Sequence, residues 1–233
     1  MQSAPHIIKD FDNSLKELKE GVLSMAAKTR HNLERSIQAL LKRDSELANS
    51  AIADDDEVDE LEREIDRRGM DILVKYQPVA TDLRFVISSM KISTNLERIS
   101  DHAVNIAKRA RKVITTPELP DVTLVEPVYA MADTLLRDAV SSFSDGDSPL
   151  GASLHARDKE LDQLYKSATT QYGNRIEDTE GRSKEYLHLI FIARSLERIG
   201  DLACNIGEDA VYFERAKDLR HKSKGERRVI GQE

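Results

Sequence analysis

An eleven-residue segment at positions 96–106 occurs again one hundred residues later, at 196–206. The first copy reads LERISDHAVNI and the second reads LERIGDLACNI, so eight of the eleven positions are identical. A hydrophobic core requires only apolar residues at helical spacing, and it would not by itself retain the Glu, Asp and Asn that both copies carry. The repeat therefore predicts a chain built from two related halves that share more than their packing.

The periodicity of apolar residues predicts helices throughout. Apolar residues recur at steps of three and four along nearly the whole chain, and no stretch alternates with a period of two. Aromatic residues make up only 5% of the chain and Trp is absent, a composition typical of long amphipathic helices. The helices are expected at 10–43, 45–77, 79–113, 123–143, 148–177 and 182–217.

Two prolines mark the boundary between the halves. Pro117 and Pro120 cannot both lie inside a helix, so we place the division there. Residues 1–116 are expected to form a first three-helix bundle, and residues 117–233 a second one with a basic C-terminal tail. Each amphipathic helix must bury its apolar stripe against other helices. The predicted fold is therefore all-α, with two tandem three-helix bundles related by internal duplication.

Both halves carry rows of acidic residues on two successive helices. In each copy of the repeated segment, Glu, Asp and Asn stand four residues apart and lie nearly opposite the apolar stripe. The preceding helix carries a second row in each half, and the two rows can face one shared groove. The second groove should be less acidic, because Tyr165 and Thr169 stand at the positions of Glu62 and Asp66.

Metal binding is one interpretation of these rows. Carboxylates four residues apart on a helix repel each other, and a divalent or trivalent cation would reverse that cost. Oxygen ligands alone suit magnesium, calcium, manganese or iron, and zinc is less expected where neither His nor Cys contributes. A solvated acidic surface is the alternative for any single row, but the duplication of both rows favours a metal site.

Other features limit the classes of function. The net charge of −7 disfavours nucleic acid as a partner. Cys204, the single cysteine, cannot form an internal disulfide and is expected to be a small buried thiol without partners for a zinc site. The sequence has no recognisable signal peptide and no apolar run long enough to span a membrane, so a cytoplasmic protein is expected.

The sequence resembles the PhoU family of bacterial phosphate-uptake regulators. The resemblance rests on QPVATDLR at residues 77–84, followed by the LERI and DHAVNIA motifs of the repeated segment, and it covers nearly the whole chain. It implies a cytoplasmic, often homodimeric protein with two three-helix bundles. Such a protein is a negative regulator of phosphate uptake and of the phosphate-starvation response. Its implied partners are the ATPase subunit of the phosphate ABC transporter and the phosphate-sensing histidine kinase.

The resemblance also implies metal ions, of which iron, manganese, magnesium and zinc are candidates, on the paired acidic motifs. The implied ligands are Asp55, Asp59, Glu97, Asp101, Asp158, Asp162, Glu197 and Asp201. Two positions depart from the family pattern: Ser100 stands where Gly is usual, and Leu202 where His is frequent. Neither is expected to touch the acidic positions. The implied role is not enzymatic, and a metalloenzyme or a metal-free helical scaffold is the alternative.

Overall fold

The computed structural model describes residues 9–178, 181–217 and 219, and within them the chain is helical without any strand. The all-α prediction is confirmed, whereas most of the expected basic tail lies outside the described residues. The elements are α1 (Lys9–Lys42), α2 (Ser45–Ala53), α3 (Asp55–Tyr76), α4 (Ala80–Ile114), the 3-10 helix η1 (Pro120–Val125), α5 (Glu126–Asp145), α6 (Ser148–Asp178) and α7 (Ser183–Arg215). None of the helices in this part of the chain combines the length and apolar character needed to cross a bilayer.

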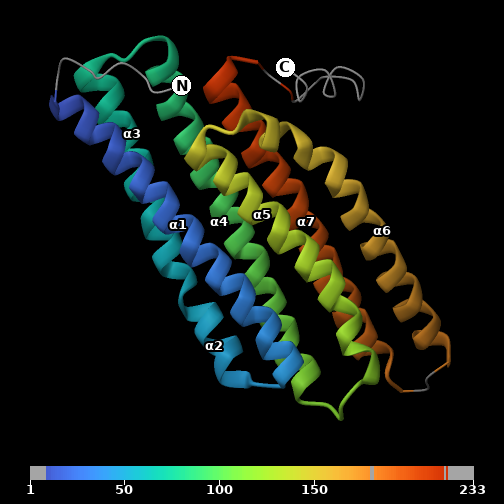
Figure 1. Cartoon of the computed structure of the whole chain (residues 1–233). Coiled ribbons are helices and arrows are strands. Elements are labelled where there is room, and N and C mark those ends of the chain that lie inside the picture. The colour runs from blue at the N-terminus through green and yellow to red at the C-terminus, as the bar shows by residue number, and fades with distance from the viewer. Residues whose placement is uncertain (1–8, 179–180, 218, 220–233) are drawn as a thin grey trace.

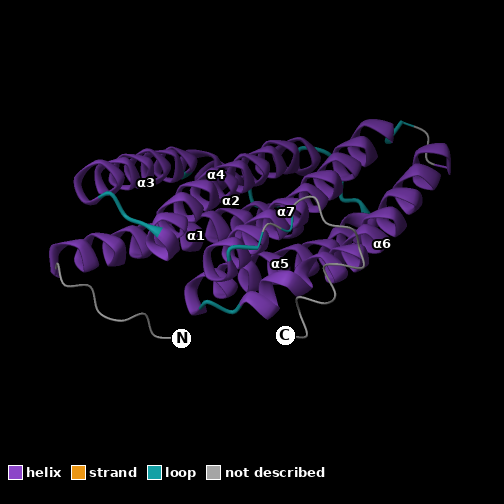
Figure 2. Cartoon of the chain, turned by 90° about the horizontal axis from the view of Figure 1, so that it is seen from above, coloured by secondary structure: helices purple, strands orange, loops and turns teal. Residues whose placement is uncertain are grey.

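The helices form two bundles that lie side by side. Helices α1 to α4 make the first bundle and α5 to α7 the second, and α4 packs along α7 between them (Figure 1). Helices α3 and α6 lie at the two outer edges, as both views show (Figures 1 and 2). Buried residues of both halves belong to one continuous hydrophobic cluster. The two bundles therefore share a core.

Specific contacts join the halves where α4 meets α7. The ring of Phe85 on α4 stacks on Phe143 of α5 with 5.7 Å between centroids, and meets Phe213 of α7 edge-on at 5.3 Å. Ser88 Oγ donates a hydrogen bond to the backbone oxygen of Asp209 at 3.1 Å, and Lys91 Nζ lies 3.3 Å from Asp209 Oδ1. These contacts set the position of one bundle relative to the other.

One predicted helix is wrong, because residues 45–77 form two helices instead of one. Helix α2 ends at Ala53 and α3 begins at Asp55. Residues 54–57 are four consecutive acidic residues, which are favourable in the first turn of a helix and repel one another in its interior. The equivalent residues 157–160 read RDKE, and α6 continues through them without a break. The charge pattern explains why only the first half is divided.

An ion pair at this break is conserved between the halves with its charges exchanged. Arg35 of α1 pairs with Asp54 in the first half. In the second half the equivalent residues are Asp138 and Arg157, whose Oδ2 and Nη1 atoms lie 2.6 Å apart. Arg35 thus contacts the residue between α2 and α3, and Asp138 of α5 contacts the equivalent position of α6, so the contact persists although each residue has changed sign.

Helices α6 and α7 approach closely at two glycines. A Cβ atom added to Gly151 would lie 2.6 Å from Ser142 Oγ and 2.8 Å from the backbone oxygen of Gly207. A Cβ atom on Gly207 would in turn lie 3.0 Å from the backbone oxygen of Gly151 and 2.5 Å from Leu154 Cδ1. The two backbones are therefore in contact, and only glycine fits there without a shift of one helix.

This packing predicts opposite effects of one substitution at two positions of α6. Gly151→Ala should lower the free energy of unfolding by about 1–3 kcal/mol, because the added methyl overpacks the contact with α7. Gly173→Ala, where a Cβ would meet nothing within 4 Å, should raise it by up to about 1 kcal/mol through helix propensity. Urea unfolding of both variants measures the difference, and equal stabilities would contradict the close approach.

Candidate functional site

The first acidic cluster lies between α3 and α4. Burial is the largest cause that raises the pKa of Glu97, followed by repulsion from Asp101, Glu62, Asp59 and Asp55, and together they bring it to about 7. The four predicted ligands of the first half are thus close enough to influence one another, and Glu62 joins them. The side chain of Glu97 is half-buried, whereas Asp101 is exposed at the rim.

Ser100 contacts this cluster, contrary to the expectation that it would not. Its Oγ donates a hydrogen bond to Asp55 Oδ1 at 2.7 Å, which opposes the rise that burial causes in the pKa of Asp55. Repulsion from Asp59 and Asp101 raises that pKa further. The serine therefore holds one carboxylate oxygen of Asp55 in a defined orientation toward α4.

The second cluster lies at the equivalent place between α6 and α7. Burial, then repulsion from Asp201, Asp162 and Glu197, raises the pKa of Asp158 to about 6, while His155 opposes the rise. Burial and Asp201 likewise raise the pKa of Glu197. The structure therefore also brings the four predicted ligands of the second half together.

The two clusters differ in how their charge is balanced. In the second, Arg198 Nη1 lies 2.9 Å from Asp201 Oδ2 and its Nε lies 3.4 Å from Glu197 Oε2. Tyr165 and Thr169 stand where the first half has Glu62 and Asp66. The second cluster is thus less negative than the first, as its sequence predicts.

Crowded carboxylates with raised pKa values are typical of an ion site. The charges of these partly buried side chains repel one another, and a bound cation would turn that repulsion into attraction. The first cluster offers only carboxylate oxygens among its predicted ligands, a donor set that suits hard cations such as magnesium or manganese, and also iron. These residues fit the metal ions that the sequence led us to expect, and a ligand role for them stays a prediction.

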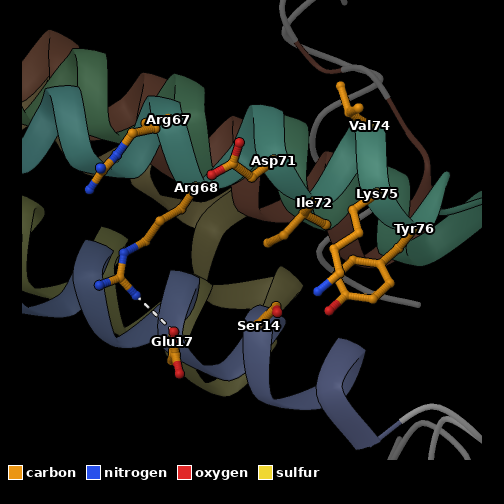
Figure 3. A pocket seen from close by; sticks show the side chains of 9 residues that line it. All are labelled: Ser14, Glu17, Arg67, Arg68, Asp71, Ile72, Val74, Lys75 and Tyr76. Atoms are coloured by element: carbon orange, nitrogen blue, oxygen red, sulfur yellow. Dashed lines mark hydrogen bonds and ion pairs between the residues drawn. The ribbon is translucent and has the colours of Figure 1, made fainter.

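A surface cleft lies elsewhere, between the start of α1 and the end of α3 (Figure 3). Glu17 of α1 faces Arg68 of α3 across it, with Oε2 and Nη1 3.0 Å apart. Arg68 also binds Glu64 at 2.6 Å, so its charge is already compensated. Asp71 in this cleft is twelve residues beyond Asp59 on the same helix, or about 18 Å along its axis. The cleft is therefore separate from the acidic cluster.

Three residues beside the second cluster were not among the predicted ligands: His155, Cys204 and Glu208. Cys204 is a buried thiol, as predicted, and the structure brings His155 and Asp158 near it, which the sequence did not suggest. Ligand atoms of His155, Asp158 and Cys204 all lie within 4.8 Å of one another. The Nε2 atom of His155 also lies 2.7 Å from Oε1 of buried Glu208. A comparison of the two repeats could have pointed to them, because Ile52, Val104 and Lys108 occupy the equivalent positions.

Comparison with known proteins gives consistent matches over most of the chain. The family model of the PhoU domain matches twice, at residues 22–110 and 126–210. The "Phosphate-specific transport system accessory protein PhoU homolog" of Pseudomonas putida is 34% identical over 93% of this chain and 85% of its own length. The Aquifex aeolicus homolog of the same description is 34% identical over 91% of this chain and 97% of its own.

Two solved structures share the fold. The crystal structure of PhoU from Pseudomonas aeruginosa superposes with a TM-score of 0.85 and 32% identity, covering 89% of this chain and all of that one. The "phosphate transport system regulatory protein PhoU" from Streptococcus pneumoniae superposes with a TM-score of 0.82 and 26% identity, covering 90% of this chain and 99% of that one. The shared architecture therefore extends over both bundles.

The raised pKa values predict how stability depends on pH in the metal-free protein. Between the unfolded value of 4.5 and the folded value of about 7 for Glu97, the folded state binds more protons than the unfolded state. Protonation of Glu97 therefore adds to the free energy of unfolding. This contribution is complete below pH 4.5 and is lost as pH rises through about 7. The raised pKa of Asp158 acts in the same direction.

Glu97→Gln should therefore stabilise the protein at pH 8, by on the order of 1 kcal/mol after allowance for solvent screening, and should change little at pH 4.5. Urea unfolding in the presence of a chelator at both pH values measures this. Glu60→Gln on the exposed face of α3 is the control, and it should show no such difference. A Glu97→Gln variant that is less stable at pH 8 would show that the carboxylates do not repel.

Proposed function

The chain belongs to the PhoU family, and from this membership we propose that it is a cytoplasmic negative regulator of phosphate uptake and of the phosphate-starvation response. It acts by binding the ATPase subunit of the phosphate ABC transporter and the phosphate-sensing histidine kinase, and it forms a homodimer. The relatives' description as accessory proteins of the phosphate-specific transport system supports this role. Metal ions, with iron, manganese, magnesium or zinc as candidates, bind its two acidic clusters.

Metal binding is supported mainly by one observation: each half of the protein brings four acidic residues together at the same place. Asp55, Asp59, Glu97 and Asp101 meet between α3 and α4, and Asp158, Asp162, Glu197 and Asp201 meet between α6 and α7. Raised pKa values in both clusters support a site that a cation completes. Without a bound cation, partly burying and crowding these charges destabilises the protein in both halves.

A binding role is favoured over catalysis by where these residues lie. Carboxylate di-iron bundles direct their ligands into the bundle interior from several helices. Here the acidic rows of the first half lie on two neighbouring helices, where Asp55, Asp59 and Glu97 are only partly buried and Asp101 is exposed. A metal held there alters the charge of a surface on which a partner docks. The metalloenzyme and the metal-free scaffold are the competing functions.

Metal content tests the site. Replacing Glu97 and Asp101 together by Ala should abolish ion binding by the first half and leave the helix content unchanged, because these side chains lie outside the core. Protein purified without a metal-affinity tag is analysed for bound metal and by circular dichroism. The control is Asp56→Asn with Glu60→Gln, which removes the same charge from the exposed face of α3. Full metal stoichiometry in the first double variant would exclude these ligands.

Regulation is tested in cells and with purified partners. Deleting the gene should raise expression of phosphate-uptake genes when phosphate is plentiful, because a restraint on the kinase has been removed. Binding to the ATPase subunit and to the kinase should weaken as salt increases, because an acidic surface recognises a basic one electrostatically. A chelator should also change the affinity, since removing a cation alters the surface charge. No association with either partner at any salt concentration would refute the regulatory role.

A further inference from the structure

The second half contains a group of potential metal ligands that differ in chemistry from the carboxylates around them. His155 and Asp158 lie on consecutive turns of α6, and Cys204 lies opposite them on α7. One ligand atom from each of the three residues lies within 4.8 Å of the other two. Nitrogen and sulfur ligands favour borderline or soft metals such as zinc, in contrast to the oxygen ligands of the first cluster.

Glu208 orients His155 for such a role. The Nε2 atom of the imidazole lies 2.7 Å from Glu208 Oε1, and because a carboxylate only accepts, this nitrogen carries the proton. Nδ1 is then the ring nitrogen left to bind a metal. A histidine that donates its second N–H to a carboxylate is the usual arrangement around a protein-bound metal. Glu208 is only 6% exposed, so its orientation is set by the surrounding structure.

The packing of α6 on α7 brings these residues together. Gly151 and Gly207 put the two backbones in contact one turn away from His155. On the other side of the group, a Cβ atom at position 200 would lie 3.1 Å from Asp158 Oδ1, so Gly200 admits that carboxylate against α7. The first half has Ala48, Ala107 and Ser100 at these three positions.

The first half serves as an internal comparison. His155, Cys204 and Glu208 correspond to Ile52, Val104 and Lys108, whereas Asp158 corresponds to Asp55 and is unchanged. Two aliphatic side chains cannot ligate a metal, and a lysine would repel one. The second half thus differs from the first at the nitrogen ligand, the sulfur ligand and the orienting carboxylate together, while it keeps the shared aspartate.

We propose that His155 Nδ1, an Asp158 oxygen and Cys204 Sγ bind one borderline-soft divalent cation, such as Zn²⁺, with Glu208 as the positioning residue. Tetrahedral zinc keeps such ligand atoms roughly 3.5 Å apart, so the side chains must close slightly around the ion. Three protein ligands leave a fourth position for water. The site shares Asp158 with the second acidic cluster and in that respect deepens the proposed metal binding, but its nitrogen and sulfur ligands make it separately testable.

Binding requires one protonation change. The Cys204 thiol must lose its proton to become the thiolate ligand, and this proton passes to solvent when the metal–sulfur bond forms. His155 binds as the neutral imidazole, so no proton leaves its Nε2. The affinity of the site should therefore fall as pH is lowered, and a weakly buffered titration should record about one proton released per metal ion.

Cobalt is a suitable probe, because Co²⁺ replaces Zn²⁺ and gives a sulfur-to-metal charge-transfer absorption only when a thiolate is bound. Titration of the metal-free full-length protein with Co²⁺ should produce this absorption, with an amplitude at saturation that corresponds to one thiolate-bound Co²⁺ per chain, and Zn²⁺ should abolish it. Cys204→Ser should remove the absorption. His155→Gln and Glu208→Gln should each weaken the affinity of that site by about 10- to 100-fold. Circular dichroism and urea unfolding verify that each variant is folded.

The first acidic cluster provides the matched control. Glu97→Gln with Asp101→Asn should leave the charge-transfer absorption unchanged, even if it removes other metal from the protein. Cobalt that binds without this absorption would refute the proposal and leave metal binding by the carboxylates intact. Unchanged affinity in both folded His155→Gln and Glu208→Gln would refute it as well. Conversely, an absorption in a protein whose acidic clusters bind nothing would support this site and exclude the carboxylate sites.

Discussion

The packing of α4 against α7 is the contact on which the rest of the structure depends. Each of these helices is the last of its bundle, and each carries one copy of the repeated segment. Their apolar faces enter the common core, and Ser88, Lys91 and the ring of Phe85 join the two halves through Asp209 and Phe213. With that side of each helix occupied, the acidic row is left at the margin where α3 or α6 covers it. Arg198, which pairs with Glu197 and Asp201 of the second cluster, is also close enough to influence His102, the neighbour of Asp101, so the two clusters are near each other along the α4–α7 contact.

Electrostatic cost distinguishes these clusters from an ordinary acidic surface. Exposed carboxylates keep their charges apart and hydrated, whereas burial and mutual repulsion raise the pKa of Glu97 to about 7 and that of Asp158 to about 6. A fold selected only for stability would replace such residues. Their presence in both halves is consistent with clusters that are stabilised by a bound cation. Such a cation would also change the surface charge at a partner's docking site.

The two halves make equivalent contacts with different residues. The ion pair between the first and second helices keeps its place while its charges are exchanged, Arg35 with Asp54 in one half and Asp138 with Arg157 in the other. The acidic run that divides α2 from α3 has no counterpart in α6, which is continuous. Around the clusters, Ser100 supports Asp55 in the first half, whereas Gly200 admits Asp158 in the second. Equivalent backbone positions thus present unlike ligand chemistry.

Sequence alone determined the helical class, the duplication and the eight acidic positions, because helical periodicity and a repeat are local properties of the chain. It also predicted that two rows would share a groove, since the faces of adjacent helices follow from their spacing. The division at Asp54 was missed because the apolar pattern continues across it, although the charge run was visible. Only the tertiary structure decided that Ser100 reaches Asp55, and that His155, Asp158 and Cys204 meet beside Glu208. The second of these groupings depends on how closely α6 and α7 approach, which Gly151 and Gly207 set from positions distant in the sequence.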